Sequence, residues 1–199
     1  MERIEAVKNY VQKRLEGNSN GHGMDHILRV YHNVLQLLAH FPEANRELCI
    51  IAALVHDLID DKVAAHPEQE KTALAERFKR LGFSSDFSEN VMFIIDNMSF
   101  RKGQKLTTIE GQIVQDADRL DALGAIGISR TIMYGGAHGR TLYKEGDRSN
   151  DTCIGHFHEK LYTLESSFNT ESARKIAKKR TAFMREFEAK LIAEIEGRQ

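Results

Sequence analysis

Apolar residues recur at helical spacing along most of the chain. The first stripe runs through Ile4, Val7 and Val11, and similar stripes continue toward the C-terminus. No segment alternates between apolar and polar residues over a useful length, and the only prolines are Pro42 and Pro67. The pattern therefore predicts an all-α fold. After the first helix, the predicted helices cover residues 25–40, 43–60, 67–81, 86–99, 107–123, a short stretch around 126–132, 153–168 and 171–197.

The chain of 199 residues has a length typical of one domain. We expect a single domain over residues 1–199 with its core in 22–125. The segment 43–60 is apolar through most of its length, which places it at the centre of the fold. A glycine-rich loop is expected at 135–151, and the C-terminal helices follow at 153–197. A loop of this length in a compact domain is often a lid or a binding segment.

Charge and cysteine usage narrow the class of protein. The formal net charge is −1, and both signs are spread along the chain, unlike the basic surface of a nucleic-acid-binding protein. The longest apolar run, residues 49–55, is far too short to span a membrane. The two cysteines form no CxxC pair, which is typical of a cytoplasmic protein. The terminal helices show no clean heptad seam, so the sequence predicts no oligomeric state.

Polar residues end the central apolar helix abruptly. The apolar segment 50–55 runs directly into His56 and Asp57. A buried, unpaired carboxylate is costly, so a cationic partner is expected there. A lysine or arginine could serve, the nearest downstream being Lys62, and a divalent metal could serve as well.

Two further segments combine acids with apolar helical patterns. One places His26 at the start of the second helix, and the other carries Asp116, Asp118 and Asp121. Asp118 and Asp121 are three residues apart and share a face that Val114 extends. We expect Asp118 to be a buried ligand, and Asp121 to orient a histidine. Asp116, like its neighbour Arg119, is expected to face solvent.

Together these residues resemble a known family. His26, His56-Asp57 and Asp118 are similar to the H…HD…D pattern of the HD superfamily of metal-dependent phosphohydrolases, whose fold is an all-helical bundle with the metal site between core helices. The segments "DHILRV", "HDLIDDK" and "QDADRLDALGAIGISR" resemble the small stand-alone bacterial HD hydrolases that act on nucleotides, as does the tail with "HFHEKLYTL" and "TESARKIAKKRTAFM". Carried over, the resemblance implies that the metal ligands are His26, His56, Asp57 and Asp118.

The implied ligand set indicates the kind of metal. Two imidazoles and two carboxylates suit Mn²⁺, Fe²⁺, Co²⁺, Ni²⁺ or Zn²⁺ better than Ca²⁺. We expect one divalent metal ion, Mn²⁺ first, with Mg²⁺ also compatible. Family members with two metals carry extra histidines between the HD pair and the last aspartate. Here the only histidine in that interval is His66, beside Pro67 in a polar turn, and we expect it at the surface.

Acids and bases near the ligands are candidates for catalysis and substrate binding. Asp60 and Asp61 follow Asp57 by three and four residues, so a continuing helix would place them on its side. We expect both to be catalytic, as a general acid or base. The candidate phosphate-binding residues are Arg29, Lys62, Arg119, Arg140, Lys144 and Arg148.

The resemblance implies hydrolysis of a nucleotide, with a nucleoside triphosphate pyrophosphohydrolase expected first. Phosphate release by a 5′-nucleotidase is an alternative. The stretch "HDLIDD" is also similar to the HD-x-x-E-D stretch of alarmone hydrolases, with Asp60 in place of the glutamate, so a 3′-pyrophosphate is another candidate substrate. A rival of a different class is a non-catalytic HD module that binds a nucleotide. The expected partner is a small-molecule nucleotide, without nucleic acid or membrane.

Overall fold

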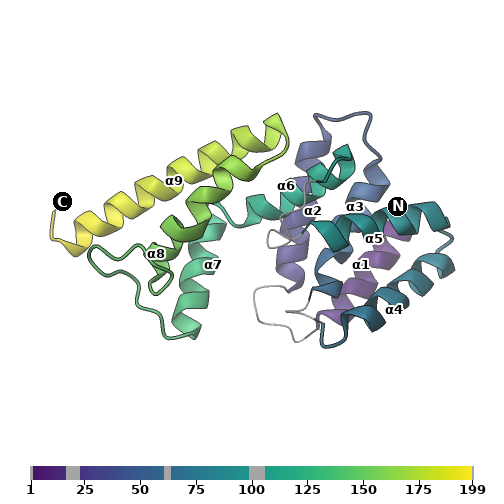
Figure 1. Cartoon of the computed structure of the whole chain (residues 1–199), viewed down its shortest axis with the longest axis horizontal. Helices are drawn as coiled ribbons and strands as arrows, with labels where there is room; N and C mark the ends of the chain where they lie inside the picture. The colour runs from purple at the N-terminus through teal and green to yellow at the C-terminus, as the bar shows by residue number, and fades with distance from the viewer. Residues whose placement is uncertain (1, 17–22, 61–63, 99–105, 199) are drawn as a thin grey trace. The chain divides into compact units, whose positions relative to one another are not determined.

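The computed structural model describes residues 2–16, 23–60, 64–98 and 106–198. These residues form helices and loops without a strand, apart from one isolated bridge between Thr141 and Thr152. The predicted all-α fold is therefore confirmed (Figure 1). The α-helices are α1 (Glu2–Arg14), α2 (Met24–Leu38), α3 (Arg46–Val55), α4 (Pro67–Arg80), α5 (Ser85–Asn97), α6 (Ile109–Asp121), α7 (Gly124–Ala137), α8 (Cys153–His156) and α9 (Glu171–Ile195). Shorter helical turns are η1 (His56–Ile59), η3 (Phe157–Leu161) and η4 (Tyr162–Ser167).

The chain divides into two compact units, Met1–Asp118 and Arg119–Gln199, with the division inside α6. Each unit has its own buried apolar residues, such as Leu54 in the first and Ala177 in the second. The prediction that residues 1–199 form one HD domain stays a prediction.

Helix α3 is the central helix of the N-terminal unit. Asn45 begins it, because its side chain accepts a hydrogen bond from the Leu48 backbone N–H at 3.0 Å. Every residue from Leu48 to Val55 is buried, and α3 packs against α1, α2 and α5 (Figure 1). The central position expected from the apolar pattern is confirmed.

The predicted helix 43–60 does not continue to residue 60. The α-helix ends at Val55, and a 3₁₀ turn, η1, follows. The His56 imidazole Nδ1 donates to the Ala53 carbonyl at 2.8 Å. A continuing α-helix would pair that carbonyl with the Asp57 N–H. The side chain thus competes for the backbone acceptor, and the tighter turn follows.

The C-terminal unit is built on α7 and α9, which pack together. The predicted helix 153–168 is interrupted: α8 passes into a π-helical turn, η3, and then into the 3₁₀ turn η4. The glycine-rich loop is also shorter than predicted, because α7 runs to Ala137 and includes Gly135. A β-carbon at Gly135 would lie 2.2 Å from the Cys153 sulfur, so the glycine lets α8 approach α7 closely.

No helix among the described ranges is both long and apolar enough to cross a membrane.

Candidate metal centre

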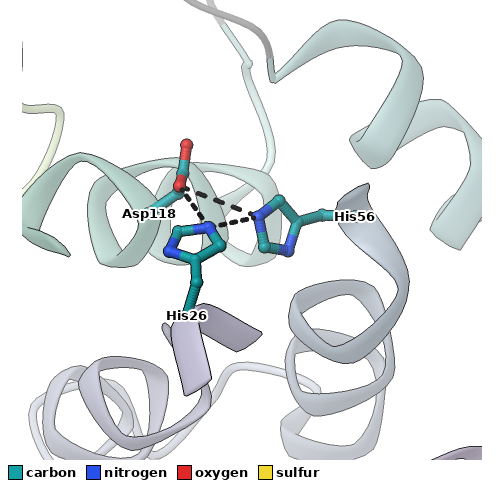
Figure 2. A group of neighbouring side chains, drawn as sticks. All are labelled: His26, His56 and Asp118. Carbon is teal, nitrogen blue, oxygen red and sulfur yellow. Dashed lines mark hydrogen bonds and ion pairs between the residues drawn. The ribbon is translucent and has the colours of Figure 1, made fainter. Parts of the chain in front are cut away.

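Three side chains from three elements of the N-terminal unit meet at one point (Figure 2). His26 comes from α2, His56 from η1 and Asp118 from α6. The two imidazole Nε2 atoms lie 3.2 Å apart. The Asp118 Oδ1 atom is 3.5 Å from His26 Nε2 and 3.7 Å from His56 Nε2. Within the described part of the chain, this trio is the group whose ligand atoms could hold a metal ion.

Asp57 lies against the same two imidazoles. Its Oδ2 atom is 3.4 Å from His26 Nε2, and its Oδ1 atom is 3.3 Å from His56 Nε2. The 3₁₀ turn η1 lets two consecutive residues, His56 and Asp57, face one point. The ligand role of Asp57 stays a prediction that this position supports.

The backbone fixes which nitrogen of His56 faces the cluster. A carbonyl oxygen only accepts hydrogen bonds, so His56 Nδ1 carries a proton in its bond to Ala53. In the neutral ring, the lone pair then lies on Nε2, the atom nearest His26 and Asp118. This is the arrangement by which histidine ligands are commonly oriented in metal sites.

The cluster is buried on most sides and open at Asp118. His26, His56 and Asp57 are 2%, 6% and 4% exposed, whereas the Asp118 side chain is 34% exposed. A ligand approaching from solvent would meet the Asp118 side of the cluster. Burial lowers the pKa of His56, but the charges of Asp57, Asp118 and Asp60 and the hydrogen bond to the Ala53 carbonyl together raise it above its ordinary value.

The residues present fit a divalent transition metal. Ligand atoms about 2.0–2.2 Å from one ion lie roughly 2.8–3.6 Å from each other. The separations among the Nε2 and carboxylate atoms are 3.2–3.7 Å, all but the longest within this range. The donors are two imidazole nitrogens and carboxylate oxygens, which suit Mn²⁺, Fe²⁺, Co²⁺, Ni²⁺ and Zn²⁺. His66 is exposed at the start of α4, as expected, so it does not extend the cluster.

Asp60 directly follows η1, the turn that carries His56 and Asp57. It adopts an extended conformation rather than lying on a continuing helix. Its negative charge is one of those that raise the pKa of His56. Asp61 and Lys62 lie outside the described residues, so their predicted roles stay predictions.

The predicted phosphate-binding residues occupy varied surroundings. Arg29 pairs with Asp25 on α2 at 2.7 Å, one turn beyond His26. The Arg119 guanidinium donates to the Ser167 carbonyl in the C-terminal unit. In the same unit, Arg140 is half-buried, whereas Lys144 and Arg148 are exposed. Their predicted contact with substrate stays a prediction.

One expectation for α6 is wrong. Asp116 is fully buried rather than facing solvent, and Ile113, Val114 and Ala117 around it are buried too. Asp121 forms an ion pair with Arg130 of α7. The predicted contact of Asp121 with a histidine stays a prediction.

Asn33 was not among the residues predicted from the sequence. This buried residue of α2 donates its side-chain N–H to the Ala117 carbonyl of α6 at 2.9 Å. Ala117 precedes Asp118, so the bond ties the helix of one candidate ligand to the backbone beside another. The signal was present in the sequence, because Asn33 lies seven residues after His26 and therefore on the same helical face.

Residues 23–123 match the HD domain family, and the chain belongs to that family. The resemblance drawn from the H…HD…D pattern is therefore confirmed. The protein YpgQ of Bacillus subtilis is 39% identical over 99% of this chain and 96% of its own. The crystal structure of YpgQ in complex with ADP is similar with a TM-score of 0.82 and 34% identity, covering 98% of both chains. An HD-superfamily hydrolase from Bacillus thuringiensis gives a TM-score of 0.84 and 35% identity, covering 98% of this chain and 97% of the other.

The bond from Asn33 predicts a measurable effect on metal binding. The Asn33→Leu variant keeps the side-chain size but leaves the Ala117 carbonyl without this donor, so α6 is held less firmly. We expect Mn²⁺ to bind about tenfold more weakly, which is the low end of the range for removing a hydrogen bond that supports a metal ligand. We also expect the unfolding free energy to fall by about 1–2 kcal/mol. Mn²⁺ titration by calorimetry measures the first effect. The exposed Asn90 of α5 offers the control Asn90→Leu; equal affinities in the two variants would contradict the assignment.

The raised pKa of His56 predicts that protons and metal compete. In the metal-free protein, the protonated imidazole stabilises the fold below the ordinary pKa of 6.5, and this contribution is lost as the pH rises through the raised pKa. Metal binding must displace that proton. We therefore expect Mn²⁺ affinity to increase with pH until the raised pKa is passed. Calorimetry in two buffers of different ionisation enthalpy counts the released protons, and no proton release at any pH would contradict the prediction.

Proposed function

We propose that the protein is a metal-dependent phosphohydrolase that acts on nucleotides. Among such activities, we propose that of a nucleoside triphosphate pyrophosphohydrolase. The observation that carries the proposal is the convergence of His26, His56 and Asp118, with Asp57 against both imidazoles. Asp60 directly follows the turn that carries His56 and Asp57. The complex of the relative YpgQ with ADP supports a nucleotide as the ligand.

Each of these side chains has a distinct task in the proposed reaction. His26, His56, Asp57 and Asp118 would hold one divalent metal, with Mn²⁺ proposed first. When bound, such an ion lowers the pKa of water and neutralises charge on a phosphoryl group. Because phosphoryl transfer depends mainly on positioning and charge stabilisation, no protein nucleophile is required.

Asp60 is proposed as the general base. Its carboxylate lies close enough to His56 to affect the pKa of that imidazole, and its side chain is neither fully buried nor fully exposed. It would take a proton from the attacking water as the water oxygen bonds to the α-phosphorus. The bond from the α-phosphorus to the bridging oxygen then breaks, and pyrophosphate leaves with the nucleoside monophosphate as the second product.

Product analysis on a nucleotide panel tests the proposed function. The panel contains deoxynucleoside and ribonucleoside triphosphates, monophosphates and a guanosine 3′-pyrophosphate, each with Mn²⁺ or with EDTA. We expect triphosphates to yield monophosphate and pyrophosphate in equal amounts, with Mn²⁺ only. Inorganic phosphate and nucleoside from monophosphates would instead identify a 5′-nucleotidase. No turnover on any substrate would favour a binding module.

A further inference from the structure

A second polar cluster lies in the C-terminal unit, around the side-chain oxygen of Asn150. This Oδ1 atom accepts a hydrogen bond from the Arg140 guanidinium at 2.9 Å and another from His156 Nδ1 at 2.6 Å. All three side chains are partly buried. The shared acceptor is a neutral amide, so these contacts orient the arginine and the histidine without neutralising the guanidinium charge.

The backbone holds the two sides of this cluster firmly together. Arg140 lies where the loop after α7 begins, and Asn150 lies near its end. Thr141 and Thr152 form a bridge between these two points, and the Cys153 N–H donates to the Thr141 carbonyl at 2.9 Å. The two ends of the glycine-rich loop, which was predicted as a lid or binding segment, are therefore held together by backbone contacts. The cluster of Arg140, Asn150 and His156 lies at these joined ends.

Gly155 brings the end of the loop close to α8. A β-carbon at this position would lie 1.8 Å from the Ser149 carbonyl oxygen, so only glycine permits the approach. The backbone of residue 149 is thus pressed against the helix that carries His156. This contact fixes the neighbouring Asn150 relative to the imidazole.

Two cationic residues, Arg140 and Lys160, act on the His156 imidazole. Lys160 lies four residues beyond His156, in the π-helical turn η3, and is exposed. Burial, then Lys160 and Arg140, lower the pKa of His156 to about 4. Near neutral pH the ring is therefore uncharged. Since Nδ1 donates to Asn150, Nε2 carries the lone pair and can take up a proton when an anion binds.

We propose that Arg140, His156 and Lys160 form an anion site that binds the phosphate groups of a pyrophosphate or nucleotide ligand. The guanidinium and the ammonium supply charge-assisted hydrogen bonds, and Asn150 holds the arginine and the imidazole in place for them. This site would bind the phosphate groups of the proposed substrate or product. The inference rests on the proposed function only in the choice of phosphate as the anion. It adds His156, Lys160 and Asn150 to the residues predicted from the sequence.

Calorimetric binding in EDTA tests the site apart from hydrolysis, with inorganic pyrophosphate and ADP as probes. The informative variant is Asn150→Asp, which keeps an oxygen for Arg140 and His156 but adds a negative charge. We expect at least tenfold weaker pyrophosphate binding, with an unchanged or higher Tm. Arg140→Gln should weaken binding similarly. Lys178→Gln, which removes an exposed lysine of α9, should bind as the wild type does.

A second readout is specific to the imidazole. In the NMR spectrum, the His156 ring signals should move on addition of pyrophosphate to the wild type, and should stay in place in Asn150→Asp. Similar affinities for pyrophosphate and ADP assign the site to the phosphate groups alone, whereas much tighter ADP binding assigns it to a nucleotide. Pyrophosphate binding that neither Asn150→Asp nor Arg140→Gln weakens overturns the inference, even where Mn²⁺-dependent hydrolysis persists. If the variants weaken pyrophosphate binding as expected but no nucleotide is hydrolysed, the anion site is supported and the proposed function is contradicted.

Discussion

Replacing Asp118 by asparagine is expected to lower nucleotide turnover by about 10²–10³-fold, the range for losing one preorganised charge-stabilising group. The variant keeps the size of the side chain but removes the charge that faces both imidazoles at 3.5 and 3.7 Å. Mn²⁺ binding should weaken in parallel. Because the side chain is one-third exposed, the fold should remain, with a Tm close to that of the wild type. Initial rates over a Mn²⁺ titration measure the effect.

The matched control is Asp86→Asn, the same chemical change at an exposed site in the first turn of α5. It should leave turnover and Mn²⁺ affinity unchanged. Wild-type turnover in Asp118→Asn at saturating and at limiting Mn²⁺ would contradict a ligand role for Asp118.

Replacing Asp60 by asparagine is expected to lower the maximal rate by about 10²–10⁴-fold, as for the loss of a general base. Unlike Asp118→Asn, it should leave Mn²⁺ affinity within a few-fold of the wild type, because Asp60 is proposed to act on water rather than to hold the metal. The two variants therefore separate two roles of neighbouring carboxylates. Rates at saturating Mn²⁺, together with metal titrations on the same samples, make the comparison.

An unchanged maximal rate of Asp60→Asn at saturating Mn²⁺ would assign the proton transfer to another group.

The sequence could predict the site because its residues break strong local patterns. His56 and Asp57 interrupt a helix that is otherwise apolar, and Asp118 lies on an apolar face of another helix. Such polar residues need partners when buried, so the pattern indicated a cationic partner, and the resemblance to the HD pattern implied that His26, His56 and Asp118 would meet. The structure brings these three side chains together as the resemblance implied.

The failures arise where tertiary contacts override periodicity. Asp116 was expected at the surface because one face of an amphipathic helix is normally exposed. Its helix is instead buried on several sides, with Gln115 also enclosed and donating to the Met98 carbonyl at 3.0 Å. Asp121 pairs with Arg130, nine residues further on in the next helix, and hydrophobic spacing does not encode that pairing. Likewise, the end of α3 at Val55 depends on a side-chain bond from His56 to Ala53.

The π-helical turn after α8 shows the same limit. Apolar spacing through 153–168 is compatible with a continuous helix, and the sequence predicted one. The observed segment changes from α to π to 3₁₀ geometry within those residues. The π turn spans the stretch between His156 and Lys160, so the local irregularity contributes directly to the anion site that we propose.

The most direct test of the account is the number of metal ions per chain at which hydrolysis saturates. Metal-free protein would be titrated with Mn²⁺, with bound metal counted by electron paramagnetic resonance and nucleotide turnover measured in the same samples. We predict that turnover rises in proportion to bound Mn²⁺ and saturates at one ion per chain, and that Asp118→Asn binds Mn²⁺ more weakly and turns over about 10²–10³-fold more slowly. Saturation at two ions, or full turnover in EDTA, would contradict it.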